Sequence, residues 1–277
     1  MPSDSFGFGG FYSEGINMTP EEKILLAKIE DKLRQCSENS MITNSVFLDM
    51  HERSVASGIK NSFGGIRMFF YGGFTDSERS IALFLPEYIS DEPSEYFDKF
   101  PKDDPLAVIE IEKDKFSPAL GHRDYLGALM GLGIKREMTG DIIVTESGCR
   151  MAVLAKIAPF IAENLDKAGR GTLKAKIIPP SQAREGANAV GIPDSFTVSS
   201  MRLDSVVKNA FRVSRGDAAD AIECGMVYVN DIECTKPDKK IGGGDKVVFR
   251  RKGRIIIDDC SSVSKKGRVI VEIIRFQ

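Results

Sequence analysis

The sequence predicts an α+β protein made of an N-terminal helical segment, a central α+β sandwich and a smaller C-terminal domain. Helical and strand-like patterns mix along the middle of the chain without a fixed repeat. A length of 277 residues suits two domains, or three small ones. The content of 42% hydrophobic and 28% charged residues is typical of a folded protein and excludes a disordered one.

The expected domain boundaries follow shifts in composition along the chain. We expect a lead-in and helical module over residues 1–60 and the central α+β domain over residues 61–180. Pro179-Pro180 and the small residues that follow predict a linker over residues 181–196. The C-terminal domain then covers residues 197–277 and ends in a β-hairpin.

The net charge of −2 hides an asymmetry between two parts of the chain. Residues 197–277 carry 16 Lys and Arg against 11 Asp and Glu, which is +5. Residues 1–196 carry 22 against 29, which is −7. Because a basic segment attracts nucleic acid whatever the total charge, the C-terminal part is the candidate for such a partner.

Cysteine spacing and hydropathy indicate the cellular compartment of the protein. The five cysteines form no Cys-x-x-Cys pair, so we expect neither a disulfide framework nor a zinc ribbon. No apolar run reaches about eighteen residues, and the first basic residue is Lys23, so neither a spanning helix nor a signal peptide is expected. The sequence predicts a cytoplasmic protein with no membrane partner.

The N-terminal part is expected to be helical. In residues 19–22, Thr19 can cap a helix, Pro20 suits its first turn and Glu22 can bond back to the cap. Apolar residues then recur at helical spacing, and a second helix is expected over residues 47–59.

The central part alternates between helical and strand-like patterns. Pro159 is expected to kink or break the second of its helices. We expect strands over residues 66–71, 81–85, 108–111, 141–145 and 173–178, and helices over residues 121–130 and 151–165.

The C-terminal part has clear capping and turn signals. A short helix is expected over residues 202–210, and Ser214 can cap a second helix that ends at Gly225. Asn230-Asp231 is a two-residue hairpin turn between apolar residues. Further strands are expected over residues 246–249, 254–257 and 268–276.

This C-terminal order resembles the S-four-type RNA-binding domain, the αL motif. The residues that carry the resemblance are Arg202-Leu203-Asp204, Ser214-Arg215, Gly225, Val229-Asn230 and Gly244-Asp245. A helix that begins at Ser214-Arg215 offers backbone N–H groups and a positive end to a phosphate. The expected RNA-binding residues are Arg202, Lys208, Arg212, Ser214, Arg215, Asn230, Lys236, Lys246, Arg250 and Arg251.

Blocks over residues 47–49, 72–79, 120–142 and 265–268 are similar to the YlmH family of bacterial S-four-type proteins. The resemblance implies a central RNA-binding domain of RRM-like or ferredoxin-like character. It also implies a cytoplasmic factor that binds rRNA and tRNA on the large ribosomal subunit during quality control of stalled translation. Protein partners of the quality-control or division machinery are implied as well. A second RNA contact is expected at Arg123, Lys135 and Arg136, although the exposed aromatics of an RRM are missing.

Several motifs imitate catalytic ones. His122-Arg123-Asp124 resembles a kinase loop, but Leu129 replaces the required Asn. Arg202-Leu203-Asp204 resembles the catalytic string of pseudouridine synthases, but the Thr-Ser-Gly turn that follows there is missing. We therefore expect no catalytic residue, metal or cofactor. An RNA-modifying enzyme and a protein-interaction factor for cell division remain the alternatives.

Overall fold

The computed structural model describes residues 18–59, 64–75, 77–183, 191–250 and 252–276. The chain forms two compact units, Met1–Gly73 with Ser77–Ala183, and Phe74–Asp76 with Arg184–Gln277. Within the described residues no helix combines the length and the apolar run needed to cross a lipid bilayer. The mixture of helices and antiparallel sheets confirms the α+β class.

Helix α1 (Pro20–Asn39) begins where the sequence predicts. The backbone N–H of Glu22 donates to Oγ1 of Thr19 at 3.2 Å, and the N–H of Thr19 donates to Oε2 of Glu22 at 2.7 Å. The helix buries one stripe of side chains at helical spacing, Leu26, Ile29, Leu33 and Cys36.

A three-stranded antiparallel sheet follows α1, in the order β1-β3-β2. Its strands are β1 (Thr43–Leu48), β2 (Arg67–Tyr71) and β3 (Ser80–Leu85), and it is accompanied by α2 (Met50–Ser57) and α3 (Pro93–Lys99). Since β1 pairs with β3, this sheet joins residues on both sides of the expected boundary at residue 60.

The first module is helical only in part, because β1 lies between α1 and α2. Phe47 and Leu48, expected to open the second helix, lie in β1 and pair with Ile81 and Ser80. β-Branched and aromatic residues favour a strand here. The helix cannot start before Met50, because Asp49 caps it through the N–H of Glu52.

The central sheet has the order β5-β6-β4-β8-β7, and all neighbouring strands are antiparallel. Without the two-residue β7, the chain order βαββαβ and this strand order define the ferredoxin-like arrangement. The elements are β4 (Leu106–Lys113), α4 (His122–Gly131), β5 (Thr139–Val144), β6 (Gly148–Leu154), α5 (Ala158–Asn164), β7 (Lys167–Ala168) and β8 (Gly171–Ile178), with short 3₁₀ turns at Arg136–Met138, Ala155–Ile157 and Pro180–Gln182.

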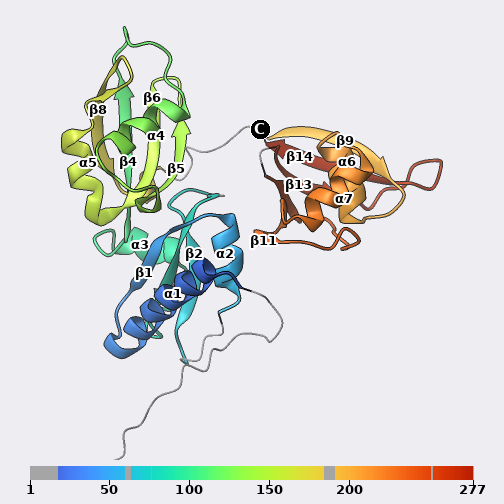
Figure 1. Cartoon of the computed structure of the whole chain (residues 1–277), viewed down its shortest axis with the longest axis horizontal. Coiled ribbons are helices and arrows are strands. Elements are labelled where there is room, and N and C mark those ends of the chain that lie inside the picture. The colour runs from blue at the N-terminus through green and yellow to red at the C-terminus, as the bar shows by residue number, and fades with distance from the viewer. Residues whose placement is uncertain (1–17, 60–63, 76, 184–190, 251, 277) are drawn as a thin grey trace, which may run out of the picture. The chain divides into compact units, whose positions relative to one another are not determined.

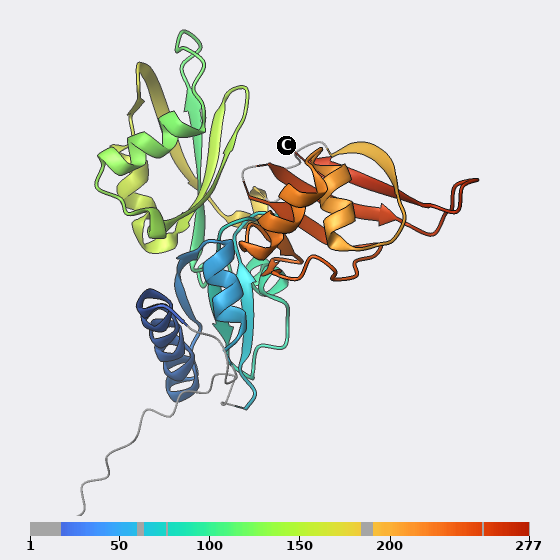
Figure 2. The same cartoon turned by 45° about the vertical axis from the view of Figure 1, so that its right-hand side comes forward.

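Both central helices pack on the same face of this sheet (Figures 1 and 2). Tyr125 and Leu129 of α4 and Ile161 of α5 share one core with Ile109 of β4 and Met151 of β6. The opposite face of the sheet is therefore not occupied by these helices.

The helix expected over residues 151–165 is confirmed only in its second part, as α5. Residues 151–154 belong to β6 and pair with β4, because an apolar run of this length suits a buried strand as well as a helix. Pro159 lies in the first turn of α5, where its missing N–H costs no hydrogen bond, and so it starts the helix rather than kinking it.

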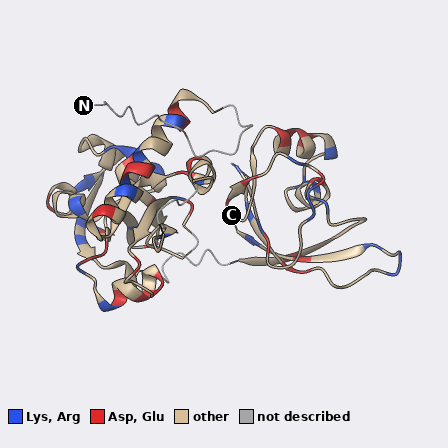
Figure 3. Ribbon diagram, turned by 90° about the horizontal axis from the view of Figure 1, so that it is seen from below, with Lys and Arg blue, Asp and Glu red and all other residues tan. Residues whose placement is uncertain are grey.

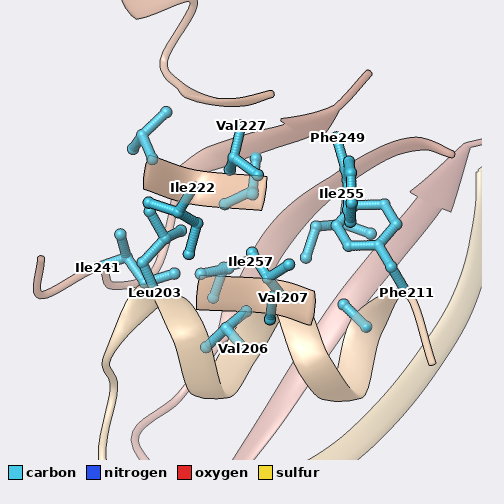
Figure 4. Packing of buried hydrophobic residues seen from close by; sticks show 14 of the residues in the cluster. Leu203, Val206, Val207, Phe211, Ile222, Val227, Ile241, Phe249, Ile255 and Ile257 are labelled. Carbon is cyan, nitrogen blue, oxygen red and sulfur yellow. The ribbon is translucent and has the colours of Figure 1, made fainter. Parts of the chain in front are cut away.

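The C-terminal unit is a six-stranded antiparallel sheet in the order β11-β10-β12-β13-β14-β9 with two helices. Leu203 and Val207 of α6 and Ile222 of α7 share one apolar cluster with side chains of the sheet, among them Val227 and Ile255 (Figure 4). The elements are β9 (Ile192–Val198), α6 (Leu203–Ala210), α7 (Arg215–Glu223), β10 (Val227–Val229), β11 (Ile232–Glu233), β12 (Lys246–Phe249), β13 (Gly253–Asp259) and β14 (Val269–Phe276).

The local signals of this unit are confirmed, with one addition. Asn230 and Asp231 have φ of 52° and 65°, the backbone that a two-residue hairpin turn requires. Strand β9 begins at Ile192, inside the expected linker, and pairs with β14 along its length. The Pro and polar residues of β9 are not typical of a strand, so the sequence did not predict one here. The sheet tolerates these residues because β9 lies at its edge.

Candidate nucleic-acid interface

Two arginines share one buried carboxylate at the start of α6. The Asp204 side chain is only 5% exposed. It accepts from Nη2 of Arg202 at 3.1 Å and from Nη2 of Arg215 at 3.2 Å. The arginine side chains remain 39% and 63% exposed. Asp204 thus holds both guanidinium groups in place while leaving them open to solvent.

The pKa of Asp204 reflects two opposed effects. Burial alone would raise this pKa, but the hydrogen bonds from Arg202 and Arg215 outweigh it and hold the pKa below its ordinary value. Asp204 is therefore ionised at neutral pH and anchors the two cations.

A lysine-rich segment runs beside the start of α6. The N–H of Leu203 donates to the carbonyl of Lys239, and the N–H of Asp204 donates to the carbonyl of Pro237, both at 2.9 Å. Arg202 also forms a β-bridge with Lys240. We call the solvent-facing residues Arg202, Arg215, Lys236, Lys239 and Lys240 the α6 cationic surface.

Sequence reasoning included Lys236 but missed Lys239 and Lys240. The run Lys236-Pro237-Asp238-Lys239-Lys240 before the glycine turn was the available signal. Its position beside Arg202 depends on a pairing between distant parts of the chain, which no local pattern indicates.

The start of α7 adds backbone donors to this surface. Ser214 caps the helix by accepting from the N–H of Asp217 at 3.0 Å, as predicted. Arg215 is its first residue, and the surroundings of Gly216 are open apart from Oγ of Ser214 at 3.7 Å. An anion can therefore approach the helix N-terminus closely.

Lys208 and Arg212 are exposed but lie away from the α6 cationic surface. Lys208 is in the last turn of α6, and Arg212 follows the helix with φ of 54°. An eight-residue helix is about 12 Å long, so these cations stand at its other end from Arg202.

Two of the expected RNA-binding residues have structural roles. The side chain of Asn230 donates to Oδ1 of Asp245 at 2.8 Å and accepts from the N–H of Lys246 at 2.9 Å, which ties the hairpin to the next turn. Lys246 is 18% exposed and pairs with Asp231 at 2.8 Å. Both side chains are thus engaged by partners within the domain.

Arg250, another of the expected RNA-binding residues, does not join the α6 cationic surface. Arg250 is exposed, and its N–H donates to the carbonyl of Met226, which lies beyond the C-terminal end of α7. Arg215 stands at the opposite end of that nine-residue helix. Arg251 lies outside the described residues.

The residues expected to form a second RNA contact, in the central domain, also differ in whether their charges face solvent. Arg123, in the first turn of α4, and Lys135 are exposed. Nη1 of Arg136 donates to the carbonyls of Thr139 and Gly140, both at 2.9 Å. Arg136 is thus bonded to the backbone, whereas Arg123 and Lys135 present their charges to solvent.

Arg79 lies near Arg136 and has a similar role. Its Nε donates to the carbonyl of Thr139 at 3.2 Å, and its Nη2 donates to the carbonyl of Phe47 at 3.1 Å. Burial and the nearby charge of Arg79 lower the pKa of Arg136. Arg79 thus fastens β1 to β5, whereas Arg136 bonds to the start of β5. Sequence reasoning assigned Arg79 no role.

The face of the central sheet opposite its two helices carries an ion-pair network where an RRM would present aromatics. Glu110 pairs with Arg150 and with Lys176, each at 2.7 Å. These side chains come from three adjacent strands, β4, β6 and β8. Base stacking of the RRM kind therefore has no platform at this place on the sheet.

In the C-terminal unit, the red Asp and Glu and the blue Lys and Arg are interspersed on the ribbon (Figure 3). Within the described ranges all five cysteines are free thiols, and no group of three His, Cys, Asp or Glu is placed to hold a metal ion.

Comparison with known proteins identifies the family. The model "Putative RNA-binding domain in YlmH" matches residues 101–182, and the S4 domain model matches residues 201–247. The chain is 33% identical over 223 residues to "Ribosome-associated protein quality control protein P2" of Bacillus subtilis (strain 168), an alignment that spans 80% of this chain and 82% of that protein. The chain belongs to the YlmH family.

The family assignment confirms the resemblance found in the sequence. The solved "Cell division protein ylmH from Streptococcus pneumoniae" covers 62% of this chain and all of its own, with 18% identity and a TM-score of 0.49. In this YlmH-family chain the S4 domain match contains the whole α6 cationic surface, and the central match contains Arg123, Lys135 and Arg136.

Proposed function

We propose that this chain binds RNA on the large ribosomal subunit, through rRNA or tRNA, and acts without catalysis in the quality control of stalled translation. The name of its Bacillus subtilis relative joins ribosome association with protein quality control, which supports this role. A ribosomal partner also supports a cytoplasmic location. The observation that carries the proposal is the α6 cationic surface of the S4 domain.

The chemistry of this surface suits the sugar–phosphate backbone of a folded RNA. Guanidinium groups bind phosphate oxygens in a fork, and Asp204 holds two of them in fixed positions. Lysines 236, 239 and 240 add charges that position RNA without reading its sequence. If about five of these groups contact phosphates, the logarithm of affinity should fall with a slope of roughly −4 against the logarithm of salt concentration.

The experiment reverses two exposed lysines and leaves the Asp204 cluster intact. Lys239→Glu with Lys240→Glu should release the full-length protein from large ribosomal subunits in gradient co-sedimentation at physiological salt. The control is Lys23→Glu with Lys28→Glu, which changes the net charge equally on exposed positions of α1. Sedimentation of the first variant with the ribosome to the same extent as the control would refute the site.

The enzyme alternative depends on Asp204. A catalytic carboxylate must reach its substrate. Here the carboxylate is buried, and its oxygens accept hydrogen bonds from Arg202, Ser205 and Arg215. Such an arrangement supports an anchor for the arginines rather than a nucleophile. A modified nucleotide that disappears from cellular RNA on Asp204→Asn, in a variant that still binds RNA, would instead support the enzyme.

The division alternative makes a different prediction. A protein-interaction factor should retain its partner after nuclease treatment and at high salt, where phosphate contacts are screened. We expect ribosome association of this chain to be lost under both conditions.

A further inference from the structure

The C-terminal domain carries a second basic feature, the hairpin that joins β13 to β14. The N–H of Ser264 donates to the carbonyl of Arg268 at 2.7 Å, and the N–H of Gly267 donates to the carbonyl of Ser264 at 2.9 Å. A bridge between Val263 and Val269 closes the base of this turn. The hairpin is thus internally bonded, and it projects past the sheet in two views (Figures 1 and 2).

The tip of the hairpin is cationic and has no acidic residue close in sequence. Lys265, Lys266 and Arg268 are exposed, and no Asp or Glu occurs between Asp259 and Glu272. Within the described residues none of the three forms an ion pair. Figure 3 shows the colour of Lys and Arg at the tip of a projecting hairpin. Lys265 and Lys266 thus stand together without a counter-charge, and beside them Nη2 of Arg268 donates to the carbonyl of Thr197 at 3.1 Å.

The sheet topology places this tip at the same end of the domain as the α6 cationic surface. The start of β14 pairs with the end of β9 through Val269 and Val198. The chain reaches the α6 cap at Arg202 only four residues after Val198. The carbonyl of Met201, beside that cap, accepts from the N–H of Ile241, directly after Lys240. The base of the hairpin therefore lies at the same end of the sheet as Arg202 and Lys240.

We infer that the β13–β14 hairpin is a second phosphate-binding element, which grips the backbone of a folded RNA that also lies on the α6 cationic surface. Lys266 is three residues before Val269, so the tip extends about 10 Å beyond the end of β9. Two separated cationic clusters suit an extended, stiff polyanion such as an RNA helix rather than a small anion. The inference rests on the proposed function and adds to it a contact outside the S4 domain match, which ends at residue 247.

The test compares neutral variants of the full chain by the salt dependence of binding to a 20-base-pair RNA hairpin. Lys265→Gln with Lys266→Gln removes two contacts and should make the slope shallower by about 2, given roughly 0.9 per phosphate. The affinity ratio of parent to variant should then shrink by about tenfold between 50 and 200 mM salt, from the same slope. Lys23→Gln with Lys28→Gln is the matched control, and a tip variant with the slope of this control would overturn the inference.

A third variant separates failure of the inference from failure of the proposed function. If Lys239→Gln with Lys240→Gln weakens RNA binding and the hairpin variant does not, the α6 cationic surface stands and the hairpin contact is refuted. If the parent protein ignores the RNA hairpin and the ribosome alike, both fail. Loss of ribosome binding with intact RNA binding would assign the hairpin to a ribosomal protein instead, which also refutes the inference. All substituted lysines are exposed, and equal urea midpoints would show that the variants fold alike.

Discussion

Two regions of the molecule each place a pair of arginines near one aspartate, with opposite results. In the C-terminal unit, Arg202 and Arg215 bond to the carboxylate of Asp204, which leaves their outer edges exposed. In the first unit, Arg79 and Arg136 bond to backbone carbonyls, and both are half-buried. What a guanidinium is bonded to, rather than its presence in a motif, decides whether it is available to a ligand.

The pKa values of Asp204 and Asp141 also differ because of the groups that each carboxylate is bonded to. Arginine hydrogen bonds keep the pKa of Asp204 low against the opposing effect of burial. Asp141 accepts instead from the backbone N–H groups of Glu78 at 2.7 Å and of Arg79 at 3.1 Å. Burial outweighs these bonds and raises the pKa of Asp141 to about 6. One carboxylate holds cations at a surface, and the other joins the segment before β3 to β5.

The largest expected effect on stability comes from removing both arginine partners of Asp204. Arg202→Gln with Arg215→Gln should lower the free energy of unfolding by about 3 kcal/mol, because a buried carboxylate is left without a counter-charge. The loss should shrink at acidic pH, since protonation of Asp204 then relieves it. Urea unfolding at several pH values measures both parts.

Arg215→Gln alone is the control for this prediction. Arg202 still pairs with Asp204 in that variant, so stability should change little while RNA binding weakens. A double variant as stable as the parent at neutral pH would show that Asp204 needs no partner, and the contrast between the two regions would fail.

A smaller effect, of opposite pH dependence, is expected at Asp141. Its folded pKa of about 6 lies above the ordinary 3.8, so ionisation opposes folding. Relative to Asp141→Asn, the parent protein should therefore lose about 2 kcal/mol of stability as the pH rises from 4 to 6, because a tenfold change in a protonation equilibrium corresponds to roughly 1.4 kcal/mol. Parallel stability curves for the two proteins across this range would place the pKa of Asp141 at its ordinary value.

The features predicted well from the sequence depend on neighbours within a few residues. The cap at Ser214 and the turn at Asn230-Asp231 are confirmed because side-chain and backbone chemistry over a few residues determines both. Patterns that suit two structures were misread: residues 151–154 form a strand because β4 pairs with them, a partner more than thirty residues away.

The candidate site shows the same limit. Arg202 and Arg215 were found from the motif, but Lys239 and Lys240 reach the surface only through pairing with the start of α6. Asn230 was chosen as a ligand because the motif contains it, and Lys246 because of its charge. The structure gives both a partner within the fold. Charge and motif order predict which domain binds, whereas the three-dimensional contacts select the individual side chains.

The smallest expected effect separates two adjacent residues of the second candidate contact. Arg136→Gln should cost about 1–2 kcal/mol of stability, because the carbonyls of Thr139 and Gly140 lose a charged donor in a half-buried place. Lys135→Gln should leave stability unchanged, since that side chain is exposed, and should weaken RNA binding if the central domain contacts RNA. Urea unfolding and RNA titration of both variants provide the comparison. If Arg136→Gln reduced RNA affinity at unchanged stability, its guanidinium would be a ligand despite its backbone bonds, and the distinction between the two arginine pairs would not hold.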